Sequence, residues 1–110
     1  MGIANYKLTK PQKKAAREII DKGLQRDYQK GLEKIENILG KWRSGKMNNQ
    51  EAYLATYKAV SNQDKYLARR YDNITGSRYL MTIYGLYMDE VISEEELGPL
   101  GEEVKKMIVE

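Results

Sequence analysis

The sequence RYLMTIYGLYMDEVI, residues 78–92, decides the fold of this chain because it offers almost no polar face. A surface helix shows one apolar stripe, whereas apolar residues surround most of this segment, so we expect neighbouring segments to cover it on several sides. The segment has about 15 residues, and a helix that crosses a bilayer needs about 20 apolar residues. We therefore expect the buried core helix of a soluble protein with no membrane partner.

Length and composition favour a single globular domain. A chain of 110 residues buries about two-thirds of the surface that its unfolded form exposes, which is enough for one core. The absence of cysteine argues against a secreted scaffold held by disulfides, and the first residues lack the apolar run of a signal peptide. We expect a flexible N-terminal arm at residues 1–10, one helical domain at residues 11–110, and a cytoplasmic location.

A long first helix is predicted from a cap at Thr9 to about Arg43. Its apolar residues recur every three or four positions and form one narrow stripe. The stripe consists of Ile20, Leu24, Tyr28, Leu32, Ile35, Leu39 and Trp42. Gly23, Gly31 and Gly40 each cost a helix about 1 kcal/mol relative to alanine, so packing must hold this helix together. Close approach of another helix is one interpretation of these glycines, and simple tolerance is the other.

A second helix is expected to return antiparallel to the first. Gly45 suits the left-handed conformation that ends a helix, and Asn48 with Glu51 forms a capping box that starts the next one. The apolar seam of the second helix is Tyr53, Tyr57, Val60, Asp64, Leu67, Tyr71 and Ile74. A further capping box at Ser61 and Asp64 would divide this helix, but we favour a continuous one.

The last third of the chain repeats the same pattern. The core helix is predicted to end near Val91, and Ser93 with Glu96 forms another capping box. Gly98–Pro99 is expected to kink the last helix or to restart it at Pro99, before a final stripe of Val104, Met107 and Ile108. Two helical hairpins with short connections predict an all-α fold, an antiparallel four-helix bundle whose first helix is the longest.

The length of the first helix suggests self-association. At 1.5 Å per residue it is about 50 Å long, against roughly 22 Å for the core helix. Part of the first hairpin therefore projects or is covered by another subunit, and a homodimer with a two-fold axis is one interpretation. In the other interpretation, the last helix and the N-terminal arm cover the apolar stripe.

The usual tools of catalysis are missing from the sequence. The chain has no histidine and no cysteine, which excludes Ser-His-Asp and Cys-His nucleophiles, ordinary zinc sites and the di-iron bundle motif. It also has no glycine-rich phosphate loop. We predict no catalytic residue, no metal site and no cofactor. The expected function is therefore that of a non-enzymatic interaction or regulatory protein, which acts on a protein partner through a binding surface.

A small anionic ligand is an alternative partner. The turn before the core helix combines arginines with the free N–H groups of a helix start, and both features attract an anion. The candidate anion-binding residues are Arg69, Arg70, Ser77 and Arg78. The structural interpretation is that Asp64 or Asp72 pairs with the arginines while Thr75 or Ser77 caps the helix.

Nucleic acid is a further alternative, because charge is distributed unevenly along the chain. Residues 1–46 hold twelve Lys or Arg and five Asp or Glu, a net +7, whereas residues 89–110 hold two and eight, a net −6. The candidate nucleic-acid-binding residues are Lys10, Lys13, Lys14 and Arg17. No known reading motif accompanies them, and the acidic last helix can equally lie against the basic first one. We favour a protein partner.

Overall fold

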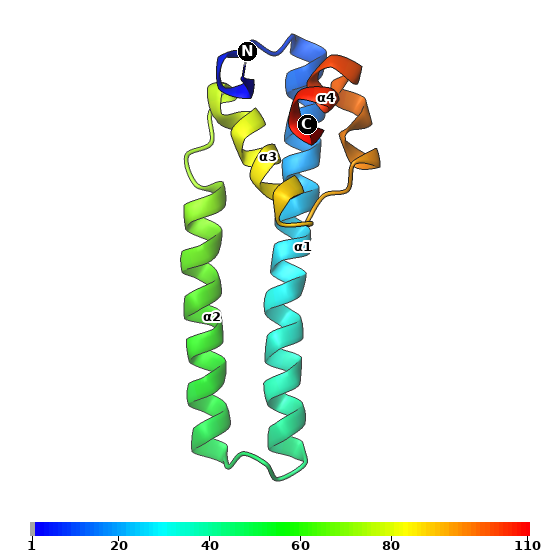
Figure 1. The fold of residues 1–110 in the computed structure, drawn as a ribbon. Helices are drawn as coiled ribbons and strands as arrows, with labels where there is room; N and C mark the ends of the chain where they lie inside the picture. The colour runs from blue at the N-terminus through cyan, green and yellow to red at the C-terminus, as the bar shows by residue number, and fades with distance from the viewer. Residues whose placement is uncertain (1) are drawn as a thin grey trace. The chain divides into compact units, whose positions relative to one another are not determined.

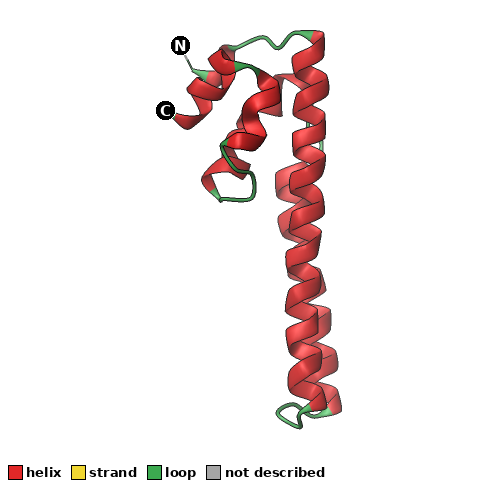
Figure 2. Cartoon of the chain, turned by 90° about the vertical axis from the view of Figure 1, so that its right-hand side faces the viewer, coloured by secondary structure: helices red, strands yellow, loops and turns green. Residues whose placement is uncertain are grey.

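The computed structural model describes residues 2–110, and these residues form helices and loops without a strand (Figure 1). Figure 2 shows the same all-helical content from the side. The elements are η1 (Ile3–Asn5), α1 (Lys10–Arg43), α2 (Asn49–Tyr71), η2 (Gly76–Arg78), α3 (Tyr79–Met88), η3 (Glu95–Leu100) and α4 (Glu102–Val109), where η denotes a 3-10 helix. The predicted all-α class and the long first helix are confirmed. The antiparallel four-helix bundle stays a prediction.

The chain divides into two compact units. Unit 1 comprises the residues up to Gln25 together with Tyr71–Glu110, and unit 2 comprises Arg26–Arg70. Helix α1 is continuous through the boundary, so its first part belongs to unit 1 and the rest to unit 2. In the segment before α1, Ile3, Tyr6 and Leu8 pack against the core of unit 1. The flexible arm at residues 1–10 and the single domain at residues 11–110 stay predictions.

Reciprocal hydrogen bonds start the two long helices. At α1 the N–H of Thr9 donates to Oε1 of Gln12 at 2.9 Å, and the N–H of Gln12 donates to Oγ1 of Thr9 at 3.3 Å. Before α2 the N–H of Asn48 donates to Oε1 of Glu51 at 3.0 Å, and the N–H of Glu51 donates to Oδ1 of Asn48 at 2.8 Å. These bonds satisfy N–H groups that a helix start leaves unpaired. The predicted cap at Thr9 and the Asn48–Glu51 capping box are confirmed.

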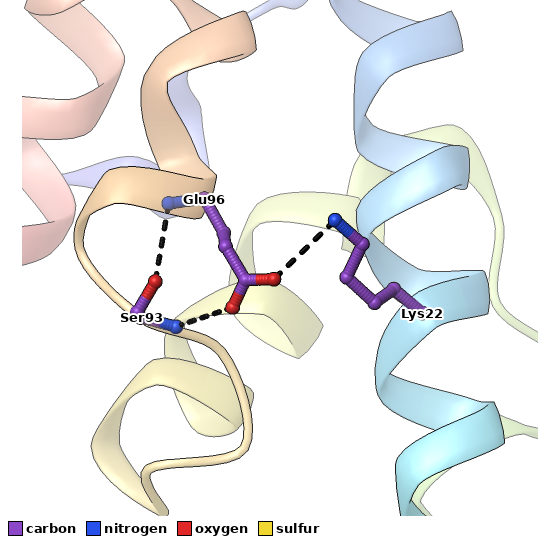
Figure 3. Close-up of polar contacts among 3 residues, drawn as sticks. All are labelled: Lys22, Ser93 and Glu96. Atoms are coloured by element: carbon purple, nitrogen blue, oxygen red, sulfur yellow. Dashed lines mark hydrogen bonds and ion pairs between the residues drawn. The ribbon is translucent and has the colours of Figure 1, made fainter.

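A third capping box also ties η3 to α1 within unit 1 (Figure 3). The N–H of Ser93 donates to Oε1 of Glu96 at 3.0 Å, and the N–H of Glu96 donates to Oγ of Ser93 at 3.3 Å. The other carboxylate oxygen of Glu96, Oε2, lies 3.3 Å from Nζ of Lys22. An ion pair that water reaches contributes at most about 1 kcal/mol, so this pair adds little to stability. The predicted Ser93–Glu96 box is confirmed.

Helix α1 ends with a left-handed residue, as predicted. Gly45 has a φ of 81°. Its N–H donates to the carbonyl of Trp42 at 3.1 Å, and the N–H of Lys46 donates to the carbonyl of Lys41 at 2.9 Å. This pair of bonds is the Schellman motif, in which glycine is favoured because it has no Cβ to clash.

The same motif ends α3 but uses a glutamate. Glu90 has a φ of 61°. Its N–H donates to the carbonyl of Tyr87 at 3.0 Å, and the N–H of Val91 donates to the carbonyl of Leu86 at 2.9 Å. The core helix therefore ends at Met88 instead of near Val91 as predicted, because Glu90 has already left the right-handed helical conformation.

The core lies in unit 1, and α3 contributes to it along one face. Leu80, Ile83 and Leu86 are buried there. The rest of this core cluster consists of Ala15, Ala16, Ile19, Val91, Ile92, Leu97, Leu100, Val104 and Ile108. Met81 and Met88 on another side of α3 remain about half exposed, at 49% and 58%. The expectation that neighbours cover this helix on several sides is therefore wrong for that side, because the segments of unit 1 cover only one face.

The remaining expectations concern α2 and the last segment. Helix α2 is continuous from Asn49 to Tyr71, so the favoured prediction of an unbroken helix is confirmed and the alternative break at Ser61 does not occur. Pro99 lies inside η3, and α4 starts only after Gly101, which has a φ of 92°. The segment thus restarts, but at Glu102 and not at Pro99. Val104 and Ile108 are buried and Met107 is half-buried, as expected for a final stripe.

Candidate functional site

Unit 2 pairs α1 with α2 mainly through small and polar residues. Nε2 of Gln63 donates to the backbone carbonyl of Asp27 at 2.6 Å. A Cβ added at Gly31 would lie 2.9 Å from Cγ of Gln63, so the helices approach each other closely there. Nε1 of Trp42 donates to Oδ1 of Asn49 at 2.7 Å near the turn. Asp27, early in unit 2, meets Gln63 late in α2, and Trp42 meets Asn49 at the start of α2. The two helices therefore run in opposite directions.

Few apolar side chains are buried in this hairpin. Among the side chains that the structure describes, Ala52 and Leu67 are the only buried hydrophobic residues of unit 2. Asp27 is also fully buried, with Oδ1 3.8 Å from Nζ of Lys30 on the next turn. Helices in proteins draw most of their stability from packing an apolar face. Within unit 2, α1 and α2 bury few apolar side chains against each other.

The large apolar side chains of unit 2 are instead exposed. Their exposed fractions run from 37% at Trp42 to 76% at Tyr53. We call the following set the hairpin apolar face: Tyr28, Leu32, Leu39 and Trp42 from α1, and Tyr53, Tyr57 and Val60 from α2. These residues are the middle and end of the first predicted stripe and the start of the second predicted seam.

The hairpin apolar face lies on one side of the hairpin. Steps of three or four residues keep side chains on one side of a helix, which places the α1 members in line and the α2 members in line. The two lines meet at a groove of about 490 Å³, to which Leu39, Trp42, Tyr53 and Tyr57 all contribute. Thus the part of the predicted stripe and the part of the predicted seam that form the hairpin apolar face lie side by side on the surface and not between the helices.

The side of the hairpin opposite the hairpin apolar face carries lysine side chains. A second groove, of about 380 Å³, opens there. It is lined by Lys34, Asn37, Ile38, Lys41, Ala55, Lys58, Ala59 and Asn62. We call it the basic groove. Unit 2 therefore presents an apolar side rich in aromatic rings and a basic side.

The candidate anion-binding residues are distributed over the two units. Arg69 and Arg70 lie at the end of α2 in unit 2, whereas Ser77 and Arg78 lie in η2 in unit 1. Arg70 is half-buried, with its guanidinium 5.1 Å from the ring centre of Tyr66, which is a cation–π contact. Arg69, Ser77 and Arg78 are exposed. The anion site stays a prediction.

The expected side-chain caps at η2 and α3 are not found. Oγ1 of Thr75 lies 3.0 Å from Oγ of Ser77, so the two hydroxyls bond to each other. Neither η2 nor α3 has a side-chain cap, and the N–H of Arg78 donates to the backbone carbonyl of Thr75 at 2.9 Å. Capping by Thr75 or Ser77 is therefore wrong, because neither hydroxyl accepts a hydrogen bond from a backbone N–H at the start of η2 or α3.

The candidate nucleic-acid-binding residues Lys10, Lys13, Lys14 and Arg17 are exposed on the first turns of α1. Lys14 and Arg17 line a hollow of about 640 Å³ that also includes Glu18 and Asp21, whose charges oppose theirs. Lys13 lines another hollow of about 640 Å³, lined also by Asn5, Tyr6, Lys7, Leu8, Gly76 and Ser77. Lys7 and Lys13 thus lie close to Ser77, which could not be predicted because no local pattern links positions so far apart. Nucleic-acid binding stays a prediction.

Three comparisons with known proteins were negative. The chain matches no protein family, no curated protein and no solved structure. Within residues 2–110, no three or more acidic side chains are grouped so that they could hold a metal ion. No helix of this described part is long and apolar enough to cross a membrane.

Proposed function

We propose that this chain is a non-enzymatic helical interaction protein that binds a protein partner through the hairpin apolar face. One observation carries the proposal: the seven large apolar side chains of the hairpin apolar face are exposed, while Ala52 and Leu67 are the only buried hydrophobic residues among the described side chains of unit 2. Exposed apolar patches beyond a few hundred Å² mark interaction sites in soluble proteins. The sequence adds support, since it lacks histidine and cysteine, which are common catalytic acids, bases and nucleophiles.

The composition of the face suits protein recognition. Four of its seven members are tyrosine or tryptophan. These residue types are enriched at the centres of protein interfaces, where a rigid ring buries a large area at a small cost in conformational entropy. The charged side chains of unit 2 that line a groove, Lys34, Lys41 and Lys58, lie on the other side. A partner with an apolar helical surface would therefore meet no charge in the groove at Leu39 and Tyr53.

Site-specific photo-crosslinking tests this function. A benzophenone amino acid replaces Tyr53 in the hairpin apolar face or, as the matched control, Lys58 in the basic groove of the same helix. After illumination in the cells that produce the protein, we expect a covalent protein adduct from position 53 and much less from position 58. Equal yields at the two positions, or no adduct at position 53, would contradict a binding surface at this face.

Nucleic-acid binding through the start of α1 is the competing proposal. It is supported by the exposure of Lys10, Lys13, Lys14 and Arg17. A protein that neutralises phosphates releases counterions, so its affinity must fall steeply as salt rises. Fluorescence anisotropy with a labelled duplex at low and moderate salt tests this. A lack of binding at low salt ends this proposal, and a salt-dependent affinity that is lost in Lys13→Gln with Lys14→Gln supports it.

Two broader expectations belong to the same proposal. We propose that the helices assemble as an antiparallel four-helix bundle, which is supported by the short turn between α1 and α2 and by their opposite directions in unit 2. We also propose a cytoplasmic location, since a chain without cysteine gains nothing from an oxidising compartment.

A further inference from the structure

We propose that the occupant of the hairpin apolar face is a second copy of this chain, so that two unit 2 hairpins meet face to face around a two-fold axis. This inference rests on the proposed function and names its partner. Three features of unit 2 support it: the exposed apolar area, the distribution of charge, and the small core of the hairpin.

The exposed area is close to what a stable dimer needs. If an aromatic side chain offers roughly 200 Å² and an aliphatic one roughly 100 Å², the exposed fractions leave about 600 Å² of the face open. Two copies would together bury at most about 1,200 Å² from these residues, which is the lower end of the range for specific interfaces. The flanking polar residues add further area. The face is therefore large enough for a dimer without help from unit 1.

The distribution of charge favours a second copy of the chain at the hairpin apolar face and disfavours one at the basic groove. The groove within the hairpin apolar face is lined by apolar residues, Asn49 and Thr56, and by no charged side chain. Two such grooves can meet without repulsion, and the charge that contacts a member of the face is the guanidinium of Arg43, which lies 5.2 Å from the ring centre of Trp42. The basic groove would instead bring Lys34, Lys41 and Lys58 of one copy against their counterparts in the other, and like charges that meet across an interface are unfavourable.

The small core gives the reason for pairing. A single hairpin with Ala52 and Leu67 as its buried hydrophobic residues, among the described side chains, has little apolar packing of its own. Facing a copy would place the exposed rings of Tyr53 and Tyr57 and the stripe at Leu32 and Leu39 in a shared interior. The product is four helices around one core, and a two-fold interface uses the same patch on both subunits.

Sedimentation equilibrium of the full chain at micromolar concentrations tests the inference. For the wild type we expect a mass near twice the 12.8 kDa of one chain. Tyr53→Lys with Tyr57→Lys should halve that mass, because charges then line the interface. These side chains are 76% and 71% exposed, so the changes disturb few contacts within one chain. The matched control, Lys34→Gln with Lys58→Gln in the basic groove, should remain dimeric.

Leu32→Lys provides an independent check from α1, should the tyrosine variant lose its helical circular dichroism. It too should halve the mass. A wild-type mass near 12.8 kDa throughout the micromolar range overturns the inference, and so does a dimer that both face variants leave intact. A monomeric wild type that still crosslinks to a different protein from position 53 overturns the second copy as partner but leaves the proposed function standing.

Discussion

Gly23 of α1 lies so close to Leu86 of α3 that a Cβ added at position 23 would come within 2.8 Å of Cδ1 of Leu86. The same Cβ would lie 3.2 Å from the hydroxyl oxygen of Tyr71. Leu86 is fully buried, so its side chain has little room to move away. The absence of a side chain at Gly23 thus allows α1 to meet the core of unit 1, which is one of the two interpretations that the sequence left open.

We expect Gly23→Ala to lower the free energy of unfolding by about 1–2 kcal/mol. Overpacking a core costs about 1–3 kcal/mol, and the better helix propensity of alanine offsets up to about 1 kcal/mol of that. Gly40→Ala in the same helix is the matched control, because a Cβ there meets nothing within 4 Å. It should raise the stability by about 0.5–1 kcal/mol. Urea unfolding measures both changes, and a stabilised Gly23→Ala variant would contradict the close approach.

Truncating the buried face of α3 should be far more damaging than truncating its exposed face. Ile83 and Leu86 are fully buried, so Ile83→Ala or Leu86→Ala should cost about 2–5 kcal/mol through lost burial and a cavity. Met81 is 49% exposed, and Met81→Ala should cost less than about 1 kcal/mol. Thermal unfolding compares the three variants. Similar melting temperatures for all three would show that α3 is not packed as described.

Glycine at position 90 should stabilise the protein. Glu90 has a left-handed backbone, with a φ of 61°, which costs a residue with a Cβ roughly 1 kcal/mol or more. Glu90→Gly removes that clash, but it also makes the unfolded chain more flexible, so we expect a net gain below about 1 kcal/mol. Gly45→Ala is the reciprocal control at the end of α1, where φ is 81°, and it should destabilise. Loss of stability in both variants would argue against strain at Glu90.

Local features of this fold could be predicted from the sequence because their causes are local. The caps at Thr9, Asn48 and Ser93 and the left-handed Gly45 each depend on residues within a few positions of one another. The early end of α3 could not be predicted, because Glu90 is not a residue type that favours left-handed backbone.

The position of the apolar stripes could not be predicted either. Periodicity shows which residues of a helix share a side, but not which neighbour covers that side. In unit 2 the two helices approach closely at Gly31 and Gln63, where one residue has no side chain and the other has a flexible one. Gly31 was the only signal of this contact in the sequence, and glycine in a helix is also compatible with simple tolerance. The four candidate anion-binding residues are close in sequence but belong to two different units, and the anion site stays a prediction.

Trp42 offers the most direct measurement of whether the hairpin apolar face is covered in solution. It is the only tryptophan in the chain, it lines the groove of this face, and it is 37% exposed in a single copy. Its emission maximum can be recorded while the wild-type protein is diluted from high micromolar to nanomolar concentration. We expect emission at short wavelength at high concentration and a shift to longer wavelength on dilution, as copies separate and water reaches the indole. Long-wavelength emission at every concentration, with unchanged helical circular dichroism, would contradict a face that is buried against a second copy.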